Sequence, residues 1–222
     1  WFGINMVLDK LHYIAVDGPI GAGKSSLVKI LAKAFHALMR REYPDSNPFL
    51  PLFYDDPSRH AFQTQLFFLL SRFQQHKELK QQDLFTQQVV CDYVFAKDLI
   101  FAKLNLTEEE FDLYLQVYRS LNQRLPKPDA VIFLQAEPKV LMDRIQMRNK
   151  DYEDGIEEDY LFKVSQAYSQ YFFQYNEAPL LVVNTSGLDF VHRREDYEML
   201  KKELFYLIKS GHEKHYVTID QR

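Results

Sequence analysis

Several residue types and patterns that mark specialised proteins are scarce in this sequence. Cys91 is the one cysteine, so no internal disulfide can form, and a reducing compartment is expected. Positive charge is not in excess: 27 Lys and Arg stand against 31 Asp and Glu, which argues against a nucleic-acid-binding surface over the whole chain. No apolar run approaches the roughly 20 residues that span a bilayer, and no secretory signal is found. We therefore expect a cytoplasmic chain whose partners are neither a nucleic-acid polymer nor a membrane.

The motifs of regulatory GTPases are also missing. None of the seven glycines has an Asp three positions before it, so the D-x-x-G motif is absent. The N-K-x-D motif is absent as well, because Asn149 and Lys150 are followed by Asp151 and Tyr152. A nucleotide-binding motif in this chain would therefore point away from a GTPase.

The residues that are present favour one α/β domain. With 222 residues, 46% of them hydrophobic, the chain is long enough for one sizeable core and short for two. No internal repeat, low-complexity tract or linker is found. Because the chain starts with Trp1 and reaches a methionine at Met6, we interpret residues 1–5 as an upstream extension or an expression remnant and expect a single domain at residues 6–222.

Short apolar runs alternate with longer segments of helical periodicity. Buried strands are predicted at residues 11–16, 89–92, 130–134 and 180–183, with a weaker strand at 38–42. Helices are predicted from Ser25 and from Pro138 onward, and at residues 57–80, 93–104, 107–124, 156–177 and 193–210. Strands that alternate with helices predict a parallel five-stranded sheet with helices on both faces.

A phosphate-binding loop (P-loop) follows the first predicted strand directly. Residues 18–25, GPIGAGKS, match G-x-x-x-x-G-K-[ST] at every fixed position, between a strand and a helix as the motif requires. The glycines let backbone N–H groups surround phosphate oxygens, and the helix adds its positive N-terminal end. The lysine supplies a charge for the β- and γ-phosphates, and the serine hydroxyl can bind Mg²⁺. The predicted triphosphate-binding residues are Gly18, Pro19, Ile20, Gly21, Ala22, Gly23, Lys24, Ser25 and Ser26.

Two carboxylates end strands that should lie beside this loop. Asp92 ends the strand at 89–92, and Glu42 ends the weaker strand, which Arg40 and Arg41 interrupt. In an open parallel sheet, the ligand site lies at the carboxyl ends of the strands. Carboxylates there can hold Mg²⁺ and can position or deprotonate an acceptor hydroxyl, as a kinase requires. The alternative for each acid is a solvated or helix-capping side chain.

Polar residues at helical spacing form two further candidate groups. Gln65 and Arg72 are seven positions apart and share a helix face, where they could read a nucleobase edge or simply face water. Arg144 and Arg148 share another face, and Lys150 follows in a polar segment. Cations on a short lid would neutralise a transferring phosphoryl group and exclude water. The alternative is a solvated helix end that carries favourable C-terminal cations.

The order and spacing of these segments resemble the deoxyribonucleoside kinase family, and most closely its bacterial deoxyguanosine/deoxyadenosine kinase branch. The resemblance covers about residues 11–183. It rests on IAVDGPIGAGKSS, EYPDSNP, FYDDP, FQTQLFFLLSR, the Asp92-Tyr93 pair with KDLIFA, and RIQMRNKDYEDGI. It implies a P-loop kinase fold with a short cationic lid, and a homodimer. It also implies Mg²⁺-dependent transfer of the ATP γ-phosphoryl group to the 5′-hydroxyl of a small-molecule deoxyribonucleoside, expected to be a purine.

The resemblance implies roles for individual residues. Glu42 matches the carboxylate at the sugar 5′-hydroxyl, and Asp92 matches the acid assigned to proton acceptance or magnesium; which one takes the proton stays open. Ser25 and Asp92 are the expected metal ligands. Tyr54 resembles the tyrosine that hydrogen-bonds the 3′-hydroxyl, and Glu153 the lid acid near the same group. The implied base readers are Gln65, Arg72 and Asp98, and the implied lid cations at ATP are Arg144, which also takes part in catalysis, Arg148 and Lys150.

Three positions depart from the family pattern. Tyr93 stands where many members have an arginine, which moves the expected phosphate clamp to Arg144 and Arg148. Lys150 replaces a usual lid arginine and provides a point charge instead of a bidentate fork. The strand before Glu42 is less apolar than in the family.

Two rival interpretations share the P-loop and the sheet. A nucleoside monophosphate kinase of the thymidylate kinase type would need an extra cationic site for the acceptor phosphate. A non-catalytic relative would keep nucleotide binding as a structural element of an assembly, although the intact Lys24, Ser25, Glu42 and Asp92 argue against it. The sequence does not rank the possible bases.

Overall fold

Six parallel strands form one sheet within the part of the chain that the structure, a computed structural model, describes: residues 11–81, 88–149, 153, 155–211 and 213–217. The predicted extension at residues 1–5 and the predicted lid cation Lys150 lie outside the described residues. The strand order is β2-β3-β1-β4-β5-β6, and every neighbouring pair is parallel. The strands are β1 (Tyr13–Asp17), β2 (Leu38–Arg40), β3 (Val89–Cys91), β4 (Ala130–Gln135), β5 (Leu180–Asn184) and β6 (Lys214–Val217).

The prediction of five strands is wrong by one edge strand, β6. This strand pairs in parallel with β5, with Lys214 opposite Leu180. Its sequence, KHYV, has no fully buried residue, so no apolar run marks it. Its formation depends on pairing with β5, and a long-range pairing of this kind leaves little trace in the local pattern.

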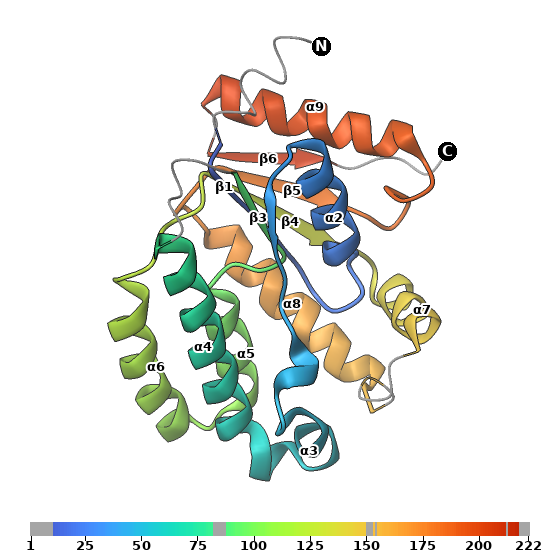
Figure 1. Ribbon diagram of the computed structural model, residues 1–222. Coiled ribbons are helices and arrows are strands. Elements are labelled where there is room, and N and C mark those ends of the chain that lie inside the picture. The colour runs from blue at the N-terminus through green and yellow to red at the C-terminus, as the bar shows by residue number, and fades with distance from the viewer. Residues whose placement is uncertain (1–10, 82–87, 150–152, 154, 212, 218–222) are drawn as a thin grey trace.

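Helices cover both faces of the sheet, so the predicted α/β class is confirmed (Figure 1). The helices are α2 (Lys24–Ala34), α3 (Leu50–Asp55), α4 (Pro57–Gln81), α5 (Lys97–Asn105), α6 (Glu108–Asn122), α7 (Pro138–Arg148), α8 (Glu158–Gln174) and α9 (Arg194–Ser210), with a short 3₁₀ turn, η1 (Pro44–Ser46). The core clusters place α2, α7 and α9 on one face and α5 and α8 on the other.

Alternate residues of β1 show how the two halves of the core are divided. Ile14 packs in one cluster with Leu27 of α2 and Leu204 of α9. The next residue, Ala15, packs in the other cluster with Tyr168 of α8. Because successive side chains of a strand point to opposite faces, this strand is buried on both sides. The P-loop that follows β1 therefore starts from a rigid position in the centre of the sheet.

A further helical layer lies outside α5. Helices α4 and α6 pack against α5 and against each other, around Leu69, Phe95 and Tyr114 (Figure 1). This layer brings α4, with two of the predicted site residues, to the side of the sheet where β2 and β3 end.

Two segments differ from the predicted pattern. The predicted helix at 93–104 begins only at Lys97, because the preceding loop is held by the backbone N–H of Val94, which donates to the buried carboxylate of Asp17 at 3.0 Å. The short helix α3 is not among the predicted helices; its Pro51 occupies the first turn, where a proline is tolerated.

A capping box starts α6 at Thr107. The hydroxyl of Thr107 accepts from the backbone N–H of Glu110 at 3.3 Å, and the Glu110 carboxylate accepts from the backbone N–H of Thr107 at 3.1 Å. None of the helices in the described ranges combines the length and the apolar character needed to cross a membrane.

Candidate active site

A cavity of about 620 Å³ lies where the strands end at their carboxyl side, between the P-loop and α4. The predicted site residues in its lining are Ile20, Gly21, Ala22, Gly23, Lys24, Ser25, Ser26, Glu42, Tyr54, Gln65, Arg72, Asp92, Arg144, Arg148 and Glu153. Gly18, Pro19 and Asp98 do not line it. Residues from segments far apart in the sequence therefore meet around one space.

The glycines of the P-loop are required by its backbone and its neighbours. Gly21 has a φ of +83°, and a Cβ there would lie 2.6 Å from the backbone carbonyl oxygen of Leu141 in α7. Gly23 has a φ of +94° and forms the N-cap of α2. A side chain at Gly21 would separate the loop from α7. The loop is thus tightly packed against the helix that carries Arg144 and Arg148.

Lys24 lies folded over the P-loop. Its ammonium donates to the carbonyl oxygens of Gly18 at 2.7 Å and Pro19 at 2.9 Å. Burial, and secondly the nearby positive charge of Lys97, lower the pKa of Lys24 to about 8. An anion on this loop would compete with the two carbonyls for the ammonium and would stabilise its charged form.

Asp92 links the P-loop to the segment that follows β2. Its Oδ2 accepts from the hydroxyl of Ser25 at 3.3 Å, and its Oδ1 accepts from the backbone N–H of Glu42 at 2.7 Å. Burial and the negative charge of Glu42 raise the pKa of Asp92. The carboxylate and the hydroxyl together form an oxygen-rich corner at the start of α2, next to the phosphate-binding loop.

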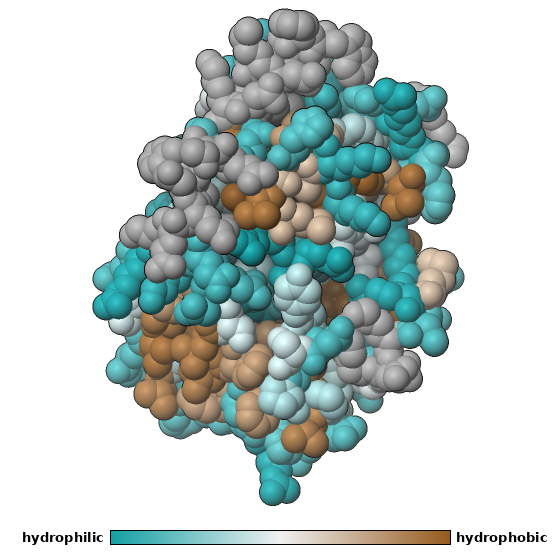
Figure 2. Space-filling model, viewed as in Figure 1, coloured by the Kyte–Doolittle hydropathy of each residue, from teal (hydrophilic) through white to brown (hydrophobic). Residues whose placement is uncertain are grey.

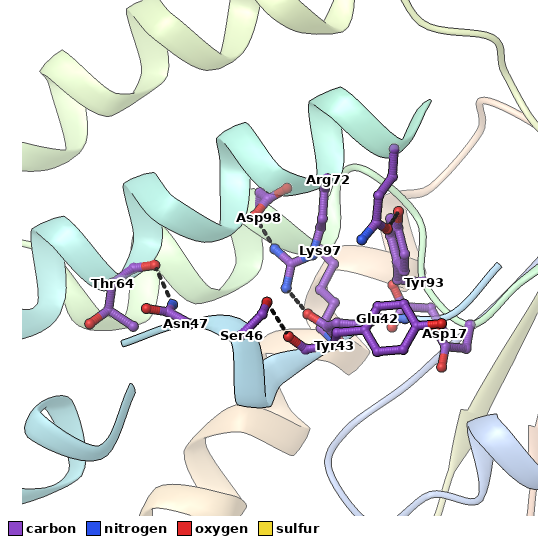
Figure 3. Close-up of polar contacts among 12 residues, drawn as sticks. Asp17, Glu42, Tyr43, Ser46, Asn47, Thr64, Arg72, Tyr93, Lys97 and Asp98 are labelled. Atoms are coloured by element: carbon purple, nitrogen blue, oxygen red, sulfur yellow. Dashed lines mark hydrogen bonds and ion pairs between the residues drawn. The ribbon is translucent and has the colours of Figure 1, made fainter. Parts of the chain in front are cut away.

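Glu42 is held by two cations, one on each carboxylate oxygen. The guanidinium of Arg72, from α4, contacts Oε1, and the ammonium of Lys97, from α5, contacts Oε2 (Figure 3). Burial alone would raise the pKa of Glu42, but the charges of Arg72 and Lys97 outweigh it and hold the pKa well below its ordinary range. Glu42 is therefore a firmly ionised carboxylate in this arrangement.

Lys97 is a site residue that the sequence analysis missed. It is 7% exposed and lines the cavity, although the sequence analysis gave it no function of its own within the KDLIFA segment. A single lysine next to an aspartate has the pattern of a solvated helix start, so the local sequence contains no signal for its burial. The ion pair with Glu42, 55 positions away, exists only in the folded chain.

Arg72 connects the Glu42 carboxylate to Asp98. Its second guanidinium nitrogen pairs with Oδ1 of Asp98, which is fully buried behind the cavity wall (Figure 3). Burial raises the pKa of Asp98 to about 6, against the opposing charge of Arg72. The guanidinium also lies 4.9 Å from the ring centre of Phe68. Asp98 thus orients Arg72, which in turn faces the cavity.

Gln65 faces the same cavity from one face of α4. Its side chain is buried, and its Oε1 has no hydrogen-bond partner among the described residues. Arg72, two turns further along the helix, lines the cavity too. Gln65 and Arg72 therefore share one face of α4, as predicted. A buried acceptor without a partner is costly, which makes Gln65 a group that a ligand could satisfy.

Arg144 contacts the loop after β5. It donates to Oγ1 of Thr185 at 3.1 Å and to the carbonyl oxygen of Thr185 at 2.7 Å. The Thr185 hydroxyl also lies 3.3 Å from the carbonyl oxygen of Ala22 in the P-loop. Arg144 therefore joins α7, the loop after β5 and the P-loop, a structural function that the sequence did not indicate.

Arg148 and Glu153 pair with each other across the end of α7. The guanidinium donates to the two carboxylate oxygens at 3.0 and 2.6 Å, and Glu153 is 7% exposed. Asn149, between them, adopts a left-handed conformation with φ +47°, which ends α7. Tyr54 lines the cavity from α3, with its ring in edge contact with Phe53.

Neither Tyr93 nor Cys91 lines the cavity. The hydroxyl of Tyr93 donates to Oε1 of Gln75 at 2.6 Å, and Tyr93 does not line the cavity. Cys91 is fully buried, and burial together with the charge of Asp92 raises the pKa of its thiol to about 12. A thiol with such a pKa is not nucleophilic at neutral pH, as expected for a core residue.

A parallel sheet with a P-loop after its strand β1, and acids that follow the two strands on one side of β1, defines the class of P-loop phosphotransferases. The family model for deoxynucleoside kinase matches residues 14–209. The chain belongs to the deoxynucleoside kinase family, and the expected family and enzyme class are confirmed.

Individual relatives agree with this family. The chain is 34% identical over 201 residues to a deoxyguanosine kinase of Bacillus subtilis (strain 168), covering 88% of this chain and 97% of the relative. It is 32% identical over 196 residues to a deoxyadenosine kinase of Dictyostelium discoideum, covering 86% and 78%. A deoxyadenosine kinase from M. mycoides, solved with bound dATP, has a TM-score of 0.75 at 25% identity, covering 86% of this chain and 98% of that one.

Proposed function

We propose that this chain transfers the γ-phosphoryl group of ATP to the 5′-hydroxyl of a purine deoxyribonucleoside. The observation that carries the proposal is the single cavity that is lined by the P-loop, Asp92 and Glu42 and also by Gln65 and Arg72 of α4. The deoxyguanosine and deoxyadenosine kinases among the relatives support a purine acceptor.

The groups around the cavity suit the two halves of the reaction. Lys24 and the N–H groups of the P-loop bind the β- and γ-phosphates of ATP. Glu42 receives the 5′-hydroxyl and accepts its proton, while Gln65 and Arg72 hydrogen-bond the base. Tyr54 and Glu153 enclose the sugar, and Arg148 is the lid cation that neutralises phosphate charge.

The oxygen donors beside the P-loop fit Mg²⁺. The Ser25 hydroxyl and the Asp92 carboxylate lie 3.3 Å apart and offer hard oxygen ligands, which Mg²⁺ prefers. No group of three or more acidic, histidine or cysteine side chains that could hold a metal occurs among the described residues. This fits an ion that takes only one or two protein ligands together with substrate phosphates and water. When bound, the ion neutralises phosphate charge.

The family resemblance implies a homodimer, and one apolar patch supports it. Leu70 of α4 and Leu113 of α6 are 49% and 53% exposed, and Figure 2 shows a brown area over these helices. A large exposed apolar patch marks a contact surface, and a twofold axis would place identical patches face to face. The cytoplasmic location stays a prediction from the sequence.

The test is an ADP-release assay with ATP, Mg²⁺ and the full chain. The acceptors are deoxyguanosine, deoxyadenosine and deoxycytidine, their ribonucleosides, and the 5′-monophosphates. We expect turnover with a purine deoxyribonucleoside, a 5′-monophosphate product by mass spectrometry, and loss of turnover in Lys24→Met. Turnover with monophosphates alone would establish the monophosphate kinase instead. Tight ATP binding without any turnover would favour the non-catalytic relative.

A further inference from the structure

Lys97 is a buried cation of the site to which the proposed function assigns no task. It is the first residue of α5 and is 7% exposed. Its ammonium pairs with Oε2 of Glu42 and lies 5.7 Å from the ring centre of Phe101, one turn further along the helix. Burying a charge is costly, so a lysine in this place needs an anionic partner at every stage of a reaction cycle.

The two cations on Glu42 are anchored differently. Arg72 is also held by Asp98, so its charge stays compensated whatever happens to Glu42. For the Lys97 ammonium, Glu42 is the single hydrogen-bond partner among the described residues. An ammonium carries three N–H donors on a flexible four-carbon stem, whereas a guanidinium is a rigid planar fork. Lys97 is therefore the cation that can leave Glu42 with the smaller structural change.

Both carboxylate oxygens of Glu42 are occupied by cations. Arg72 contacts Oε1 and Lys97 contacts Oε2, so one cation has to leave before an oxygen of Glu42 can accept a hydrogen bond from the acceptor hydroxyl. The 5′-hydroxyl would take over the vacated oxygen, Oε2, as a hydrogen-bond donor.

The phosphate side of the cavity offers Lys97 its second partner. Lys97 and Lys24 line the same cavity. Two ammonium groups in one cavity repel each other, and an anion that lies between them stabilises both. A transferring phosphoryl group spreads negative charge over three equatorial oxygens, which suits a mobile point charge.

We propose that Lys97 is a further catalytic residue, whose ammonium passes from Glu42 to an equatorial oxygen of the transferring phosphoryl group when the nucleoside binds. The proposal rests on the proposed function. In the step, the 5′-oxygen bonds to the γ-phosphorus while the bond from that phosphorus to the β,γ-bridging oxygen breaks. The proton of the 5′-hydroxyl goes to Glu42, and ADP leaves with the electron pair of the broken bond. Lys97 keeps its three protons throughout.

The test compares Lys97→Met and Lys97→Arg with the unaltered chain, and uses Lys103→Met, an exposed lysine of the same helix, as the matched control. Steady-state and single-turnover rates are measured with ATP and deoxyguanosine or deoxyadenosine. In Lys97→Met we expect kcat and the single-turnover rate to fall by about 100-fold or more, as when a transition-state charge partner is removed. The KM for the nucleoside should change by less than about threefold, because the contact of Lys97 with the phosphoryl group is strongest in the transition state.

Two further readouts separate this function from a structural one. Without Lys97, the acid limb of the kcat/KM profile should move to higher pH, because Glu42 has lost a cation. Lys97→Arg should recover part of kcat, and Lys103→Met should match the unaltered chain. A kcat within threefold of normal in Lys97→Met would overturn the proposal about Lys97 alone. A rise in nucleoside KM together with a lower melting temperature, at unchanged kcat, would overturn it too. Absence of transfer in the unaltered chain would overturn the proposed function, and this proposal with it.

Discussion

The backbone N–H of Glu42 donates a 2.7 Å hydrogen bond to Oδ1 of Asp92, across 50 positions of sequence. The two residues follow β2 and β3, neighbouring parallel strands in which Arg40 lies opposite Cys91. The chain therefore leaves both strands at the same level of the sheet. The charge of Glu42 contributes to the raised pKa of Asp92, so the two acids influence each other's ionisation. A substitution of either acid should therefore affect both the P-loop side and the acceptor side of the cavity.

Replacing Glu42 by Gln should stop the reaction at the chemical step. An amide cannot accept the proton of the 5′-hydroxyl, so kcat should fall by about 100-fold or more, with a small effect on the KM for ATP. Steady-state kinetics with a purine deoxyribonucleoside measure both quantities, and circular dichroism checks that the variant is folded. Glu109→Gln, an exposed position in the first turn of α6, is the control. Near-normal turnover in Glu42→Gln would remove Glu42 from the mechanism.

Replacing Gln65 by Ala should weaken nucleoside binding and spare ATP binding. The buried Oε1 of Gln65 has no partner among the described residues, so its hydrogen bonds are available to the base. Loss of such bonds corresponds to roughly a tenfold weaker affinity. Isothermal titration with the nucleoside and with an ATP analogue measures the two affinities separately, with the exposed Gln74→Ala on the same helix as control. An equal loss of both affinities would contradict the base-reading role.

The stability of the chain should depend on the ionisation of His76. This residue is buried in α4, in edge contact with the rings of Tyr93, Phe95 and Tyr13 at centre distances of 5.3, 5.8 and 6.0 Å. Its two ring nitrogens have no hydrogen-bond partner among the described residues. Burial, and secondly the charge of Arg72, lower the pKa of His76 to about 4.

The sign of this pH dependence follows from linkage. The folded-state pKa of about 4 lies below the ordinary value of 6.5, so the unfolded chain takes up the proton first. The contribution of His76 to the free energy of unfolding is therefore fully present above pH 6.5. It decreases as pH falls toward 4, by on the order of 3 kcal/mol. Urea titrations from pH 7 to 4 on the chain and on His76→Phe measure it. If the difference in unfolding free energy between the two is the same at every pH, His76 does not titrate in this way.

The apolar patch on α4 and α6 should mediate dimer formation. A glutamate at Leu113 would place charge in a desolvated contact and repel its copy across a twofold axis, so Leu113→Glu should be a monomer. Size-exclusion chromatography with light scattering gives the mass directly. Phe173→Glu alters an even more exposed apolar side chain on another helix, α8, and should leave the dimer intact. A monomeric unaltered chain at micromolar concentration would contradict the homodimer.

The elements with strong local signals were predictable. The P-loop lies where its motif indicates, between β1 and α2, because each position of the motif has its own backbone or charge requirement. The capping box of Thr107 and Glu110 is likewise a contact between residues three apart. In both cases the physical cause lies within one short stretch of chain, where sequence spacing is spatial spacing.

The elements that depend on distant partners were not predictable in detail. β6 has no apolar run and exists through its pairing with β5. The start of α5 was predicted four residues early, because Asp17 holds the backbone of Val94 from a position 77 residues away. Local propensity is a weak constraint when a long-range hydrogen bond competes with it.

For the site, the sequence by itself determined the phosphate-binding loop and the identity of the acids and polar residues near it. Tertiary structure alone decided which of them meet. It put Lys97 on Glu42, gave Arg72 two carboxylates, and joined Arg144 to Thr185. The reason is that buried charges are stable only in pairs, and a residue's partner is set by how the strands and helices pack, which its own neighbours in the chain do not reveal.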